Sequence, residues 1–191
     1  MGRRLSSQLQ QPFVANGWTI VFGARFEERY RELVDRVEKL NTSLPRKKYE
    51  GHPEVKLLAA VHRLVTSLIP ADPNTRDFLL EDDLSKFRRV KKHGLPERFR
   101  LFYTFSSVQR VIIPLYLNDA NTLRKRGAGS DPYEVFKRMV SQGHIGSDFE
   151  ANWNGWVSAN RDLAKKHRLS AKTRTKGAAN SSGKSARQFR R

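Results

Sequence analysis

The sequence predicts an α+β fold in which helices pack on one face of an antiparallel sheet. A short strand and two helical stretches come first, and three β-rich runs joined by short turns then occupy residues 87–117. A further helix follows these runs, which gives the order β-α-α-β-β-β-α. The chain has 191 residues, enough for one domain with an ordinary core.

The first half of the predicted domain is a strand followed by a helical hairpin. Residues 17–22 are mostly β-branched and aromatic, which is typical of a strand. Apolar residues then recur at helical spacing from Phe26 to Leu40, and a second helical stretch begins at Pro53 and stops at Pro70. Both helices have a broad apolar face, so the hairpin requires a sheet or a partner to cover it.

The three β-rich runs are predicted to form a meander over residues 87–92, 98–105 and 109–117. The last run contains Pro114, which has no amide hydrogen to donate to a neighbouring strand. It therefore predicts either an edge position or a bulge. Segment 71–84, before the meander, is acidic and rich in turn residues, and we expect it to be a surface loop.

The C-terminal part contains helices and a basic extension. Asp131 and Pro132 are typical of a helix start, as a cap and a first-turn proline, and this helix is expected to end at Gly143. From Ser170 onward apolar residues are nearly absent, which favours disorder. We divide the chain into a flexible N-terminal arm (1–15), a main domain (16–150), a C-terminal helix (151–168) and a basic disordered tail (169–191).

The composition is strongly basic. Lys and Arg number 37 against 19 acidic residues, a net charge of +18. Residues 161–191 hold 11 of these cations and one acid, so more than half of the excess charge lies in the tail. A basic tail is usually a solvated polyanion binder. With no cysteine there can be no disulfide or thiolate site, and with no long apolar segment we expect a cytoplasmic protein.

The remaining cations are concentrated on the meander. Residues 86–100 contain seven basic residues and one acid. Side chains alternate across a strand, so Arg89 and Lys91 share one face of their strand, while Arg98, Arg100 and Phe102 share one face of the next. If the hairpin register pairs these faces, cations and an exposed aromatic converge as nucleic-acid binding requires. The alternative is that the arginines merely solvate an open sheet face.

Familiar catalytic signatures are absent from the sequence. There is no phosphate-binding glycine loop, dinucleotide fingerprint or zinc-protease motif. The five histidines are not spaced as a metal site; His62 lies on an apolar helix face, and His93 lies in a turn beside the basic strands. The pair Asn118-Asp119 at a strand end favours turn formation over catalysis. Any catalysis would therefore depend on Arg, Lys and Tyr.

An ordered set of motifs resembles the YhaV toxin family over roughly residues 16–150. The motifs are Asn16-Gly17-Trp18, residues 56–62 (KLLAAVH), Arg89-Val90-Lys91, residues 98–103 (RFRLFY), Val111-Ile112-Ile113, residues 118–124 (NDxNTLR) and Tyr133-x-Val135-Phe136. The resemblance implies a RelE-like fold and an endoribonuclease that cleaves mRNA, with possible ribosome involvement, without a metal or other cofactor. It also implies a PrlF-type, AbrB-like antitoxin as a protein partner.

The resemblance also implies roles for particular residues. The candidate catalytic residues are Arg89, Lys91, Arg100, Arg124 and Tyr133. The candidate RNA-binding residues are Arg98, Lys92, His93 and Phe102. In the implied reaction the substrate 2′-OH attacks the adjacent phosphorus, while arginines stabilise the developing charge and Lys91 or a tyrosine transfers a proton.

Two other functions remain open from the sequence. The same basic sheet would suit a non-catalytic RNA-binding protein, such as a degenerate toxin. A small basic α+β domain with a cationic tail would also suit a structural protein of the ribosome. Cleavage of RNA by the purified protein distinguishes an endoribonuclease from these two alternatives.

Overall fold

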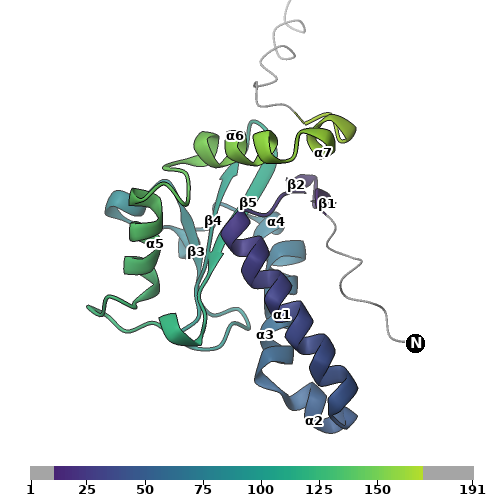
Figure 1. Ribbon diagram of the computed structural model, residues 1–191. Helices are drawn as coiled ribbons and strands as arrows, with labels where there is room; N and C mark the ends of the chain where they lie inside the picture. Colours follow the sequence, from purple (N-terminus) through teal and green to yellow (C-terminus); the bar gives the residue numbers. More distant parts are fainter. Residues whose placement is uncertain (1–10, 170–191) are drawn as a thin grey trace, which may run out of the picture.

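The computed structural model describes residues 11–169 and contains a five-stranded sheet between two groups of helices (Figure 1). The strands are β1 (Phe13–Ala15), β2 (Trp18–Ile20), β3 (Arg88–Val90), β4 (Leu101–Ser106) and β5 (Val111–Leu117). The main helices are α1 (Ala24–Ser43), α2 (Arg46–Gly51), α3 (Pro53–Arg63), α5 (Pro132–Ser141), α6 (Phe149–Ala159) and α7 (Arg161–Lys166). The α+β class and the order of the main elements are confirmed.

The sheet is mixed, with strand order β1-β2-β5-β4-β3. Strand β2 pairs in parallel with β5, where Thr19 lies opposite Val111, and the other pairs are antiparallel. The expectation of an entirely antiparallel sheet is therefore wrong. A tight hairpin can join only antiparallel strands, whereas a parallel pair needs a long connection. Between β2 and β5 the chain forms α1, α3 and the first strands of the meander, and this long connection allows the two strands to run parallel.

Helices α1 and α3 cover one face of the sheet. The apolar positions predicted for α1 are buried there except Leu40, which is half-buried; the buried ones are Phe26, Tyr30, Leu33, Val34 and Val37. Leu101 and Tyr103 of β4 complete this core from the sheet side. Helix α3 continues as a π-helical turn (Leu64–Leu68) into the short α4 (Ile69–Ala71).

Helices α5 and α6 cover the opposite face, so the prediction of helices on one face only is wrong (Figure 1). Phe102 of β4 stacks on Phe136 of α5 with ring centroids 4.4 Å apart, and Trp153 of α6 is buried in the same core. Every residue of β5 is buried. A strand covered on both faces is continuously apolar, as residues 111–117 are.

Pro114 lies in β5, a central strand, and the structure therefore selects the bulge over the edge position. Tyr103 pairs with Pro114 while Phe102 pairs with Tyr116, so Leu115 is the additional residue. The proline carbonyl still accepts a hydrogen bond from the amide of Gly23 at 2.9 Å. The bulge thus removes the need for the amide that proline lacks.

The acidic segment before β3 packs on the domain more closely than a free surface loop. It contains two single 3₁₀ turns, Arg76–Phe78 and Asp82–Leu84, and Phe78 and Leu84 are buried. Tyr103 donates a hydrogen bond to the carbonyl of Pro73 at 2.7 Å, and Leu79 forms an isolated bridge with Arg88. The acidic side chains are exposed, so the polar surface of this segment agrees with the prediction.

The two ends of the main domain differ from the expected boundaries. Residues 13–15, expected in a flexible arm, form β1, and residues 1–10 lie outside the described part of the chain. The expected C-terminal helix begins at Phe149 and is interrupted at Asn160, which separates α6 from α7. Leu169 packs against the core, and the tail from residue 170 lies outside the description. No helix among residues 11–169 is long and apolar enough to cross a membrane.

Candidate active site

Arg89 is the most buried cation of the meander. It lies at the centre of β3 opposite Phe102, faces the α5 side of the sheet, and is only 8% exposed. Its Nε and Nη1 atoms have no hydrogen-bond partner within residues 11–169. Burial lowers the pKa of the guanidinium, because the charged form loses water. A buried cation with unused donors is expected to bind an anion.

Three further cations surround Arg89, and we call the four residues Arg89, Lys91, Arg100 and Arg124 the cation cluster. The charges of Arg100 and Arg124 add to burial in lowering the pKa of Arg89. The charge of Arg89 is the main cause of a lowered pKa at Lys91, which is exposed just beyond the end of β3. Because these charges repel one another, the cluster favours a bound anion such as a phosphate.

Tyr133 lies within the cation cluster, at the first turn of α5. The guanidinium carbon of Arg124 is 4.9 Å from the centre of its ring, and that of Arg89 is 5.8 Å away. Phe102 meets the same ring edge to face at 5.4 Å. Cation–π contact and the packing below it therefore fix this phenol between two arginines.

Asp131 connects Arg124 to helix α5. Its carboxylate accepts a hydrogen bond from the amide of Tyr133 at 3.0 Å, which caps the helix, and another from the amide of Lys125 at 3.0 Å. It also forms an ion pair with Arg124. The sequence identified this buried acid as a cap, but nothing in its spacing indicated the contact with Arg124.

We expect Asp131→Ala to lower the free energy of unfolding by about 0.5–2 kcal/mol through loss of the cap. Asp131→Asn should lose less, because its one remaining side-chain oxygen can still cap the helix, whereas the ion pair and the hydrogen bond from the amide of Lys125 are lost. Chemical denaturation of both variants, with the exposed Asp162→Ala as the control, measures the difference. Equal losses in the two variants would show that capping contributes nothing.

A turn after β5 places Arg124 beside the strands. The buried Asn118 accepts a hydrogen bond from the amide of Arg100 at 2.5 Å and donates to the carbonyls of Arg98 and Thr122. Asp119 caps the 3₁₀ turn at Ala120–Thr122, as its predicted turn role requires. Although burial raises the pKa of Asp119, hydrogen bonds from this turn reverse the effect and lower it. The sequence did not predict that Asn118 is buried and connects the start of β4 to this turn, since a polar residue at a strand end carries no signal of burial.

The candidate RNA-binding residues lie in different environments. Arg98 is exposed, and its Nε donates to the carbonyl of Arg124 at 3.0 Å, beside the cation cluster. Lys92 is exposed next to Lys91. His93 packs edge to face on Phe78 at 5.7 Å. Phe102 is wholly buried under α5, so its predicted contact with RNA is wrong, because a second helical layer covers this face.

The structure therefore brings all five candidate catalytic residues into one region. Arg89 and Lys91 come from β3 and its end, Arg100 from the residue before β4, and Arg124 and Tyr133 from the segment that leads into α5. Among residues 11–169 no group of three or more His, Asp or Glu residues is arranged to bind a metal ion. The site can supply dense positive charge, an ammonium group and a phenol.

A positively charged site on a small α+β domain is typical of proteins that act on nucleic acids. Residues 20–155 match the family Toxin_YhaV, described as a toxin with endonuclease activity, of a toxin-antitoxin system. The chain belongs to this family. It is 35% identical over 144 residues to "Ribonuclease toxin YhaV" of Escherichia coli strain K12, covering 73% of this chain and 92% of that protein.

A second relative gives the same result. "Toxin YhaV" of Escherichia coli O6:H1 is 35% identical over 145 residues, with 73% of this chain and 92% of that protein covered. No solved structure matches the chain. The matched region includes every residue of the cation cluster, together with Tyr133 and Asp131.

Proposed function

We propose that this toxin is an endoribonuclease that cleaves mRNA at the cation cluster and thereby inhibits translation and growth. The observation that carries the proposal is the buried guanidinium of Arg89, whose Nε and Nη1 lack partners within the described residues while three other cations surround it. Beyond the cation–π contact with Tyr133, these two nitrogen atoms have no hydrogen bond within the described residues that substrate would have to replace. A phosphate of the substrate would supply the missing acceptors.

The chemistry that fits these residues is a transesterification within the RNA. The 2′-oxygen attacks the adjacent phosphorus, its proton passes to solvent, and the bond from phosphorus to the 5′-oxygen breaks. Arg89 and Arg100 stabilise the added negative charge of the phosphorane, with Arg124 beside them. Lys91 is the first candidate to donate a proton to the departing 5′-oxygen, and Tyr133 is the second. The products are a 2′,3′-cyclic phosphate and a 5′-hydroxyl.

The same proposal includes a fold family for the domain and the protein and RNA partners of the toxin. The element order β-α-α-β-β-β-α supports a RelE-like domain over residues 16–150. Membership of a toxin–antitoxin family supports an antitoxin partner, which we propose to be PrlF-type with an AbrB-like domain. Messenger RNA as substrate supports a cytoplasmic location, and we include the ribosome in the same proposal as a further partner.

The test is cleavage of a defined mRNA by the purified full-length chain, with and without ribosomes, followed by analysis of the fragment ends. We expect cyclic phosphate and 5′-hydroxyl ends, and no cleavage where the 2′-OH at the cut is replaced by 2′-O-methyl. A parallel reaction with a chelator should proceed at the same rate. Binding without cleavage under all conditions would favour the non-catalytic RNA-binding alternative.

A further inference from the structure

A pocket opens directly beside the cation cluster, between the 79–84 segment and the start of α5. Its volume is about 340 Å³, within the range of small-molecule sites. Arg89 and Tyr133 line it, as do Leu79, Leu80, Glu81 and Glu134. We call it the side pocket. Arg89, the buried member of the cation cluster, is therefore part of the wall of this pocket.

The charge of the side pocket differs from that of the cation cluster. Three acidic residues (Glu81, Asp82 and Glu134) and two basic residues (Arg89 and Lys137) line it, which leaves one net negative charge. Lys137 is in addition paired with Asp83, with 3.7 Å between the charged atoms. A phosphate would be repelled from the carboxylate end of the pocket, so the RNA backbone is expected to stay at the arginines.

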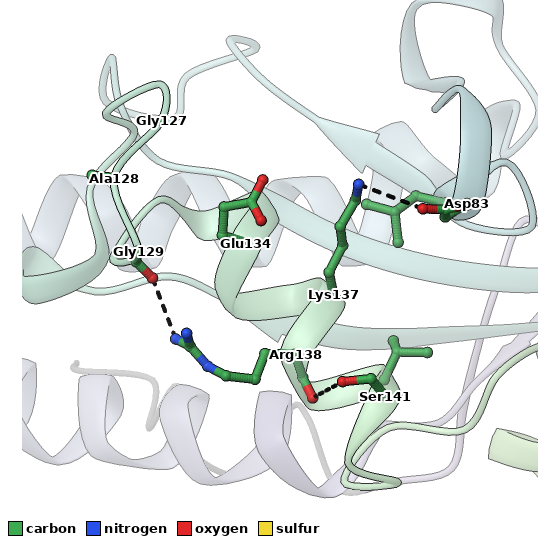
Figure 2. A pocket seen from close by; sticks show the side chains of 10 residues that line it. Asp83, Gly127, Ala128, Gly129, Glu134, Lys137, Arg138 and Ser141 are labelled. Atoms are coloured by element: carbon green, nitrogen blue, oxygen red, sulfur yellow. Dashed lines mark hydrogen bonds and ion pairs between the residues drawn. The ribbon is translucent and has the colours of Figure 1, made fainter.

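Glu134 is the carboxylate best placed to contact a ligand. It follows Tyr133 on the first turn of α5, a turn fixed by the Asp131 cap, and it forms no ion pair within residues 11–169. It also lines an adjoining pocket of about 580 Å³ on the same side of α5. Figure 2 shows Lys137 turned to Asp83 and Arg138 turned to the carbonyl of Gly129, while the Glu134 carboxylate stands apart from both.

These properties fit a nucleobase. A base is flat and uncharged, can lie against leucine and tyrosine side chains, and presents hydrogen-bond donors at its edge. A carboxylate accepts two parallel hydrogen bonds. On its Watson–Crick edge guanine presents two adjacent donors, N1–H and the 2-amino group. Adenine, cytosine and uracil each present a donor beside an acceptor, which a carboxylate would repel.

We propose that the side pocket binds the base of a nucleotide next to the cleaved phosphate, and that Glu134 selects guanine. This inference rests on the proposed ribonuclease function and adds to it a preference for guanine at one side of the cut. The cation cluster holds the phosphate, and the side pocket determines which phosphate is held. Glu134 lies outside the cation cluster, so base preference can be removed while the cleavage residues stay in place.

The test compares wild type, Glu134→Gln and the control Glu38→Gln, an exposed acid on α1. Mapping fragment ends on a long transcript first identifies the preferred base beside the cut. Oligonucleotides with A, C, G, U or inosine at that position then give kcat/KM values. We expect wild type and Glu38→Gln to prefer guanine roughly ten-fold, with inosine, which lacks the 2-amino group, between guanine and the other bases.

In Glu134→Gln we expect kcat/KM for the guanine substrate to fall roughly ten-fold, to the level of the other three bases. A wild-type enzyme without guanine preference, or a preference that survives in Glu134→Gln, would overturn the base assignment and leave the nuclease intact. A wild-type protein that leaves all RNA uncut would overturn both proposals. Thermal unfolding of the variants separates these outcomes from misfolding.

Discussion

Replacing Arg89 with alanine is expected to lower kcat for RNA cleavage by roughly 10²–10³-fold, the usual cost of removing one fixed donor to a developing oxyanion. Arg89 is the only cluster residue that is almost fully buried, and two of its nitrogen atoms have no partner within residues 11–169. The hydrogen bonds of these two atoms would form only with substrate. Single-turnover kinetics on a defined RNA measure the effect apart from product release.

The same substitution should leave the protein as stable as wild type, or more stable. Burial opposes the charge of Arg89, as its lowered pKa shows, and the neighbouring arginines repel it. Removing the guanidinium loses its contact with Tyr133, but it relieves the larger cost of burial and leaves no acceptor unsatisfied. Differential scanning calorimetry should show a Tm equal to or above that of wild type. A large fall in Tm would instead indicate that Arg89 holds the fold.

Arg88→Ala provides the matched control. Arg88 is adjacent on β3 but points to the opposite face, where it donates to Asn74 and lies 5.4 Å above the ring of Phe105. Its loss removes the same charge and should leave cleavage at the wild-type rate. Arg89→Lys keeps the charge without the planar array of donors, so it should recover only part of the activity. Full activity in Arg89→Ala would remove this residue from the mechanism.

The face assignment of the meander shows how far residue alternation predicts structure. Alternation placed Leu101 and Tyr103 on one face of β4 and Phe102 on the other, and the structure agrees. It could not show whether the second face is open, because that depends on where α5 and α6 pack. The continuous apolar run Val111–Leu117 did indicate that both faces are covered. In a strand with one face in water, apolar and polar residues alternate.

The position of Arg124 could not be predicted from the local sequence pattern, for a different reason. It lies outside every strand and helix, and its place depends on the turn that Asn118 and Asp119 organise after β5. The amide of Arg124 donates to the carbonyl of Arg98 at 3.1 Å, which brings the chain back beside the start of β4. Only the resemblance to a family motif pointed to this residue, whereas Arg89 and Arg100 also followed from charge and alternation.

Replacing Lys91 with arginine is expected to lower kcat by roughly 10²-fold or more, the low end of the contribution of a general acid. Arginine keeps the positive charge but does not release its proton at accessible pH. The charge of Arg89 lowers the pKa of Lys91, with smaller contributions from burial, Lys92 and Arg100. This shift makes the ammonium a stronger acid toward the departing 5′-oxygen. Lys56→Arg, on the exposed surface of α3, is the control and should retain wild-type activity.

The pH dependence of cleavage tests the role of Lys91 as an acid. An acid must be protonated, so the rate should be full below the pKa of Lys91 and fall as the pH rises through it. Lys91→Arg should lose this alkaline fall along with most of its rate. In Arg89→Ala the main repulsion on Lys91 is gone, its pKa rises, and the residual activity should persist to higher pH. An alkaline fall that stays in place in both variants would assign the proton to another group, with Tyr133 next because its ring lies between Arg89 and Arg124.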